Sequence, residues 1–205
     1  MVRFNEAVSR SVVTERRFGR TGAPWEFNLR DVLRWCELTM TAAGFSMSAQ
    51  SINAAVLATF PVVYLHRMRT DEDRAQMKAL FAQHFPSWNA EGSLPPPAVV
   101  TSADGVRIGV ARLQRASSGA IDAVATAEPL LLREQLPALE AAAAALAQGW
   151  MAVLAGPAAS GKTMLARSLA SFAGARLKEV RDVPLAPGSA WRRRYKTLLC
   201  PTGGA

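Results

Sequence analysis

The sequence predicts an α/β protein in which a helical domain is followed by an incomplete αβα domain that opens with a β-hairpin. Three observations support this fold class. Residues 1–87 combine helix caps with helical spacing of apolar residues, residues 88–98 contain a run of consecutive prolines, and residues 149–173 read as an apolar strand, a glycine-rich loop and a helix. We therefore expect a helical domain at 1–87, a stiff linker at 88–98, the beginning of the αβα domain at 99–180, and a basic, disordered tail at 181–205.

The helical domain has a clear helix start at Asn28. Asparagine is a good N-cap, and Asp31 stands at the third helical position, where its carboxylate can accept from the N-cap backbone. Gly44 marks the end of this helix. The residues predicted to form its buried apolar stripe are Leu29, Val32, Leu33, Cys36 and Met40. The aromatic residues expected in the core of the domain are Trp25, Phe27 and Trp35.

Two further helices are expected in this domain. One runs over Ser51–Phe60, and Pro61 kinks it or separates it from the apolar segment that follows. The other begins after Thr70, whose hydroxyl caps the helix, with Asp73 in the capping-box position.

The second domain begins with a hairpin signal. Asp104-Gly105 is a favoured turn pair, and it lies between residues 99–101 and 106–110, which are rich in β-branched residues. A helix is expected over Leu136–Gln148, and a further short strand is expected at Leu177–Val180.

The most specific motif of the chain is a glycine-rich loop. Residues 156–163 match the P-loop pattern, in which backbone N–H groups surround a triphosphate and the next helix points its positive end at the same charge. The apolar run Trp150–Ala155 before it is expected to be a buried parallel strand. In this pattern Lys162 reaches the β- and γ-phosphates, and the Thr163 hydroxyl holds Mg²⁺. The predicted nucleotide-binding residues are Gly156, Pro157, Ala158, Ala159, Ser160, Gly161, Lys162, Thr163 and Met164.

A fortuitous glycine loop is the alternative, but the strand and helix patterns on either side favour a nucleotide site. A P-loop ATPase also needs an acidic residue at the end of a later strand to hold the metal. Asp182 follows a candidate strand, but Pro184 and Pro187 come soon after it. We therefore assign no catalytic residue and do not expect hydrolysis by this chain alone.

Composition limits the classes of partner. The net charge is +8, and the cluster of Arg192, Arg193, Arg194 and Lys196 indicates a nucleic-acid contact, a nuclear signal or, more simply, a solvated or disordered tail. The two cysteines have neither disulfide nor metal-ligand spacing, and His66 and His84 are expected on helix surfaces rather than at a metal. We expect no signal peptide, no bilayer-spanning segment and no membrane partner.

Residues 18–38 closely resemble the lid segment of the midasin family, dynein-like AAA+ ATPases that remodel pre-60S ribosomal particles. The most specific part is Pro24-Trp25-Glu26-Phe27-Asn28-Leu29-Arg30-Asp31. Residues 64–73, 108–113 and 149–173 are also similar to this family, whereas residues 181–205 depart from it. In AAA+ ATPases the lid follows the P-loop domain of its own module. The order found here therefore implies the lid of one module and the start of the next.

The resemblance implies ATP and Mg²⁺ as cofactors. It implies neighbouring AAA+ modules and the pre-60S particle with its assembly factors as partners, and a location in the nucleolus and nucleoplasm. It also implies that Arg30 is a sensor arginine for the nucleotide of its own module, at a different site from Lys162. The alternative for Arg30 is a surface ion pair with Glu26 or Asp31.

The leading interpretation is thus an ATP-binding segment of an AAA+ ATPase that acts in assembly and nuclear export of the large ribosomal subunit. A second interpretation is a non-enzymatic interaction or scaffold fragment with an incomplete nucleotide site. A third, a small basic nucleic-acid-binding protein, rests on the net charge alone.

Overall fold

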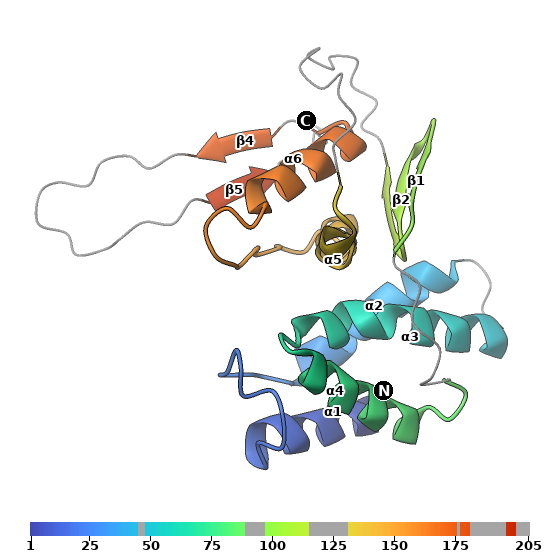
Figure 1. Ribbon diagram of the computed structural model, residues 1–205. Coiled ribbons are helices and arrows are strands. Elements are labelled where there is room, and N and C mark those ends of the chain that lie inside the picture. Colours follow the sequence, from blue (N-terminus) through green and yellow to red (C-terminus); the bar gives the residue numbers. More distant parts are fainter. Residues whose placement is uncertain (45–47, 89–96, 115–130, 176, 181–195, 200–205) are drawn as a thin grey trace, which may run out of the picture.

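The computed structural model describes residues 1–44, 48–88, 97–114, 131–175, 177–180 and 196–199. The helical domain contains α1 (Val2–Ser9), α2 (Leu29–Ala43), α3 (Ala49–Val63) and α4 (Asp71–His84). The second part contains β1 (Val99–Ser102), β2 (Gly105–Ile108), β3 (Ala111–Gln114), α5 (Leu136–Ala147), α6 (Lys162–Ala173), β4 (Leu177–Val180) and β5 (Lys196–Leu199). Figure 1 shows α2 and α3 lying between the pair α1 and α4 and the second part.

Helix α2 begins as predicted. The Asn28 side chain accepts from the backbone N–H of Arg30 at 2.9 Å, and the Asp31 carboxylate accepts from the backbone N–H of Asn28 at 3.0 Å. This reciprocal pair forms the capping box, and Gly44 is the C-cap. The sequence pattern therefore located both ends of the helix.

The buried face of α2 differs from the predicted stripe. The buried residues are Val32, Trp35, Leu38 and Thr39. Leu29, Leu33 and Met40 are exposed, and Cys36 is half-buried, so of the predicted stripe only Val32 is buried. The reason is Trp35, which is fully buried and offers far more apolar area than a leucine. The helix is rotated to place the indole inside, where its N–H donates to the Thr59 hydroxyl at 3.0 Å.

Helix α3 is longer than predicted. It begins after Ser48, whose hydroxyl accepts from the Ser51 backbone N–H at 3.1 Å, and it continues through Pro61 to Val63. Pro61 lies in the last turn, so the backbone hydrogen bond lost to proline is close to the helix end. A 3₁₀ helix, Leu65–Arg67, follows.

Helix α4 shows only half of its predicted capping box. The Thr70 hydroxyl accepts from the Asp73 backbone N–H at 3.1 Å, as expected. The Asp73 carboxylate instead accepts from the Gly19 backbone N–H at 2.7 Å, in a buried contact 54 residues apart in the chain. Asp73 therefore anchors the loop before α2 rather than the start of its own helix.

An aromatic cluster fills the helical domain. It contains Phe4, Trp35, Phe60, Tyr64 and Phe81, all almost fully buried. The Phe60 and Phe81 rings stack with centroids 3.8 Å apart, and Phe4 meets the other members edge-on. The Tyr64 hydroxyl donates to Asn5 at 3.0 Å, and burial raises the Tyr64 pKa. The prediction that Phe27 and Trp35 lie in the core is confirmed, and Trp25 packs against them partly buried.

The second part contains the predicted hairpin. Strands β1 and β2 pair antiparallel with Val99 opposite Ile108 and Ser102 opposite Gly105. A third strand, β3, which the sequence pattern did not reveal, pairs with β2 and places Ile108 opposite Ala111. The apolar face of this sheet packs against α5 and α6 in a second core that contains Ile108, Leu139 and Leu169.

The expected strand at Trp150–Ala155 is not formed. Among the described residues no strand pairs with it, and Met151 and Val153 are 84% and 79% exposed. A strand needs a hydrogen-bonded neighbour, and none of the strands described here lies beside this segment. The predicted strand Leu177–Val180 is confirmed as β4, but it pairs antiparallel with β5.

Strand β5 lies inside the tail that we expected to be disordered, 181–205. Its backbone groups pair with β4, with Leu177 opposite Leu199, so the expectation does not hold for residues 196–199. Residues 181–195 and 200–205 lie outside the described part of the chain, as do residues 89–96 of the predicted linker and the arginines of the basic cluster.

Helix α2 also contacts the second part. Leu38 belongs to the second core, the Arg34 guanidinium lies over the Trp150 ring at 5.4 Å, and the Gln148 side chain donates to the Thr41 hydroxyl at 2.9 Å. One helix therefore packs into both cores, Trp35 into the first and Leu38 into the second.

A buried carboxylate holds the turn between β2 and β3. Glu140 of α5 is 6% exposed and accepts from the Val110 backbone N–H at 2.9 Å. A Cβ at Gly109, where φ is +55°, would overlap this carboxylate, so the site requires glycine for both reasons. Burial raises the pKa of Glu140, and the hydrogen bond from Val110 opposes that rise.

The corrected buried face of α2 is testable with a matched pair of variants. Leu38→Ala removes a fully buried side chain from the second core and should lower the free energy of unfolding by about 2–5 kcal/mol. Leu33→Ala, on the same helix, removes a side chain that is 54% exposed and should change stability by about 0.5 kcal/mol or less. Urea denaturation of both variants measures the difference. A larger loss for Leu33→Ala than for Leu38→Ala would mean that the helix is rotated as the sequence pattern predicted.

The raised pKa of Glu140 predicts a pH-dependent stability difference. The folded state binds the Glu140 proton more tightly than the unfolded state, so this group's contribution to stability falls as pH rises from its unfolded pKa to its folded pKa. Glu140→Gln keeps an oxygen for the Val110 N–H and removes the titration. Unfolding free energies measured by urea from about pH 4 to about pH 7 should favour the variant increasingly as pH rises. Parallel pH profiles would contradict the assignment.

Candidate functional site

The glycine-rich loop leads directly into α6. Gly161 is the N-cap with φ of +81°, and Ala159 also has a positive φ, +61°. Left-handed residues of this kind turn the chain sharply, and such turns are common where backbone N–H groups bind an anion. Alanine is uncommon at positive φ, so Ala159 holds a backbone conformation that its residue type disfavours.

Lys162 lies over this loop. Its ammonium group donates to the carbonyl oxygens of Gly156, at 3.1 Å, and of Pro157, and to the Ser160 hydroxyl at 3.3 Å. The side chain therefore reaches back across the loop that precedes it, and its positive charge lies on the loop.

The start of α6 has no side-chain cap. The Leu165 N–H bonds the Gly161 carbonyl at 2.9 Å, so it is the first N–H of this helix with an intrahelical partner. The backbone N–H groups of Lys162, Thr163 and Met164 precede it, and the Thr163 and Met164 side chains are exposed. A helix end of this kind attracts an anion through its N–H groups and its dipole.

Gln135 comes close to the loop from the start of α5. It closes a 3₁₀ turn, Arg133–Gln135, and its side chain is half-buried. A Cβ built on Gly161 would overlap the Gln135 side-chain nitrogen. The positive φ favours glycine at 161, and a Cβ there would displace the Gln135 amide.

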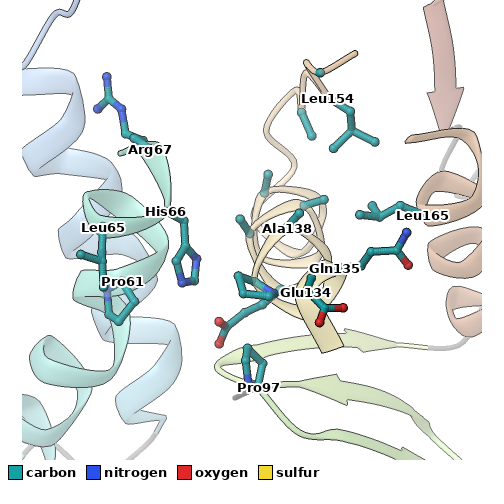
Figure 2. A pocket seen from close by; sticks show the side chains of 18 of the residues that line it. Pro61, Leu65, His66, Arg67, Pro97, Glu134, Gln135, Ala138, Leu154 and Leu165 are labelled. Atoms are coloured by element: carbon teal, nitrogen blue, oxygen red, sulfur yellow. The ribbon is translucent and has the colours of Figure 1, made fainter. Parts of the chain in front are cut away.

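A cavity of about 1460 Å³ extends from this loop to the helical domain. Figure 2 shows Pro61, Leu65 and His66 on the side of the helical domain, with Ala138, Gln135, Leu154 and Leu165 on the opposite side. From the loop, the lining residues are Gly156, Pro157, Ser160 and Lys162. Thr163 and Met164 lie at the same helix end but do not line the cavity.

The wall formed by the helical domain is basic. Its cations are Arg67, Arg69, Arg74 and Lys78. Arg67 donates to the Asp31 carboxylate at 3.0 Å and to the Glu26 carbonyl at 2.9 Å, and Arg74 pairs with Asp71. The carboxylates of Glu134 and Glu140 lie on the other side. Together with Lys162 on the loop, these residues give the cavity cations from two separate parts of the chain.

His66 is not the helix-surface residue expected from the sequence. It points into the cavity in Figure 2, and its Nδ1 is buried with no hydrogen-bond partner among the described residues. Burial, and secondarily the charge of Arg74, lower its pKa to about 4, so the imidazole is neutral at pH 7. His84 is exposed, as expected, and its Nδ1 lies 3.0 Å from the Leu80 carbonyl oxygen.

Arg30 lies in the first turn of α2, exposed, and does not line the cavity near Lys162. Asp31, one of the two partners considered for it, is instead bound to Arg67. The structure thus keeps Arg30 and Lys162 apart, and the assignment of Arg30 to a second nucleotide site stays a prediction.

Sequence reasoning missed Gln135, Glu140 and His66. Gln135 carries no motif, and only its place before the expected helix relates it to the loop. Glu140 could have been noticed in the sequence, because it is the one charged residue in the stretch Leu136–Gln148. A carboxylate buried on such a helix needs a hydrogen-bond donor. In the described residues there is no group of His, Cys, Asp and Glu suited to a metal ion, and no helix long and apolar enough to cross a bilayer.

Comparison with known proteins shows which family the helical domain matches. Residues 1–87 match the family model described as the midasin AAA lid domain. The chain is 30% identical over 198 residues to midasin of Dictyostelium discoideum, covering 87% of this chain and 3% of that protein. It is 33% identical over 174 residues to midasin of Giardia intestinalis, covering 78% of this chain and 4% of that protein.

The chain therefore spans only 3–4% of the length of these relatives. No solved structure matches it. The lid match coincides with the helical domain described above, and the similarity to midasin extends over most of the chain. Residues 1–87 are a midasin AAA lid domain, and the chain belongs to the midasin family.

Proposed function

We propose that this chain binds ATP with Mg²⁺ at residues 156–164, as a segment of a midasin-type AAA+ ATPase. One observation carries the proposal: Lys162 lies across a loop of left-handed residues, at a helix end that has no side-chain cap. Each partner of its ammonium group is an uncharged oxygen, and a phosphate offers the same cation a charged one. The Lys162 ammonium group is thus suited to exchange these loop oxygens for the oxygens of a polyphosphate.

The residues fit the nucleotide and its metal. Lys162 would contact the β- and γ-phosphates, and the exposed Thr163 hydroxyl would hold Mg²⁺. The backbone N–H groups at the start of α6 supply neutral donors for the remaining phosphate oxygens. The metal, when bound, neutralises part of the phosphate charge.

The lid, residues 1–87, is proposed to belong to one AAA+ module, and residues 99–180 to the beginning of the next, with residues 88–98 as linker. In this arrangement Arg30 serves the nucleotide of its own module. Neighbouring AAA+ modules would then be partners. The order of the lid match before the glycine loop supports this division.

The wider role follows from the family. We propose that the protein to which this segment belongs acts on pre-60S ribosomal particles and their assembly factors in the nucleus. The similarity to midasin over most of the chain supports that role.

Lys162→Ala should weaken ATP binding by at least about tenfold, because it removes the charge that meets the phosphates. Arg167→Ala is the matched control, since it removes one cation from the exposed side of the same helix. Isothermal titration with ATP and Mg²⁺ measures both. ATP should also raise the melting temperature of the unmodified chain, because it binds only the folded state. Equal affinity of the unmodified chain and Lys162→Ala would defeat the proposal and favour a scaffold role.

Hydrolysis is a separate expectation. Catalysis by a P-loop enzyme needs a metal-binding acid, a residue that orients water and a positive group for the transition state. After Thr163, Asp182 follows the strand β4, but Pro184 and Pro187 come soon after it and we assign it no metal. We therefore expect ATP binding without turnover by the 205-residue chain. Magnesium-dependent phosphate release by the purified chain, abolished in Lys162→Ala, would contradict this expectation.

A further inference from the structure

The side chain of Gln135 has one free hydrogen-bonding end, and that end is directed at the glycine loop. Its oxygen accepts from the Leu132 backbone N–H at 3.4 Å, and the nitrogen lies on the other side of the amide. That nitrogen lies against Gly161, in the space that a Cβ would occupy. Within the described residues the nitrogen has no acceptor.

The position of this donor is built into the fold. Gln135 is the residue that precedes α5, and α5 is packed into the second core through Leu139 and the buried alanines that follow it. Leu165 and Leu169 of α6 belong to the same core. The start of α5 and the start of α6 are therefore held together by packing, and Gln135 and Lys162 line one cavity.

We infer that Gln135 is a further nucleotide-contacting residue, whose side-chain amide donates a hydrogen bond to the phosphate chain of the ATP bound at the glycine loop. The inference rests on the proposed function of that loop. Gly161, which the amide touches, directly precedes Lys162, so the donor lies beside the phosphate-binding turn. Its free N–H groups match phosphate oxygens, which only accept.

This contact ties the phosphate site to the start of α5. Lys162 reaches the loop from the start of α6, and Gln135 reaches it from the start of α5. A polyphosphate held by both would bridge the two helices. Gln135 is neutral, so it adds a donor without adding to the positive charge already present on this side.

The test uses Gln135→Ala, which removes the donor, and Gln135→Glu, which keeps the shape and replaces the donor with a negative charge. Gln148→Glu is the control, because it makes the same change at the other end of α5. The probes are ATP and inorganic tripolyphosphate, each with Mg²⁺, titrated into the full 205-residue chain. Melting temperatures without ligand show whether each variant is folded.

Gln135→Ala should weaken binding of both probes by about tenfold, the usual effect of losing one hydrogen bond to a charged group. Gln135→Glu should weaken it by more, about a hundredfold, because a carboxylate faces the phosphates. Gln148→Glu should leave both affinities within about twofold of the unmodified chain. A Gln135→Glu variant that binds both probes as tightly as the unmodified chain overturns the inference.

Three other outcomes are also decisive for the inference or for the proposed function. If both Gln135 variants lose affinity for ATP but keep it for tripolyphosphate, the amide contacts the nucleoside and the phosphate assignment is wrong. If the unmodified chain binds neither probe, the proposed function of the loop fails, and this inference fails with it. If Lys162→Ala loses binding while Gln135→Glu binds fully, the proposed function of the loop stands and only the assignment of Gln135 fails.

Discussion

The burial of Trp35 is the constraint on which the rest of the arrangement depends. The indole lies in the aromatic cluster and donates to Thr59, and this fixes the rotation of α2 about its axis. With that rotation set, Leu38 faces the opposite direction from the predicted stripe and enters the second core. The same helix places Arg34 over Trp150 and Thr41 beside Gln148. A change at Trp35 would therefore be felt beyond the lid, in the position of the segment that leads to the glycine loop.

The candidate site is assembled from helix ends rather than from a sheet. In the described part of the chain, α5 and α6 pack together on the three-stranded sheet, and the loop spans the distance between them. The geometry of the loop itself is local, since it depends on the left-handed residues Ala159 and Gly161 and on Lys162 reaching back to Gly156. The contact with Gln135 is not local, because it depends on how α5 is seated in the core.

Much of the fold could be predicted from local chemistry. The cap at Asn28, the turn before β2 and the helix after the glycine loop all depend on residues close together in the sequence, and the patterns located them well. The buried face of α2 could not be predicted as well, because several leucines compete with one tryptophan and only the packed core decides between them. The partner of Asp73 was missed for a related reason: Gly19 is distant in the chain, and a capping box is the nearest local alternative.

The candidate site residues also differ in whether local sequence or tertiary packing determines their position. Lys162 could be placed from the sequence because the motif is contiguous, whereas Gln135 and His66 reach the cavity only through the tertiary structure. The strand expected at Trp150–Ala155 could not be predicted reliably from its apolar composition. An apolar run favours burial, but it does not supply the neighbouring strand that a strand requires.

That segment has a practical consequence for work with the isolated chain. Met151 and Val153 present apolar side chains to solvent on a segment that no described strand pairs with. Backbone of this kind accepts hydrogen bonds from a second molecule as readily as from a strand of its own. Self-association that increases with protein concentration is the expected behaviour, and samples kept dilute, or supplied with a peptide that covers this edge, should stay monodisperse.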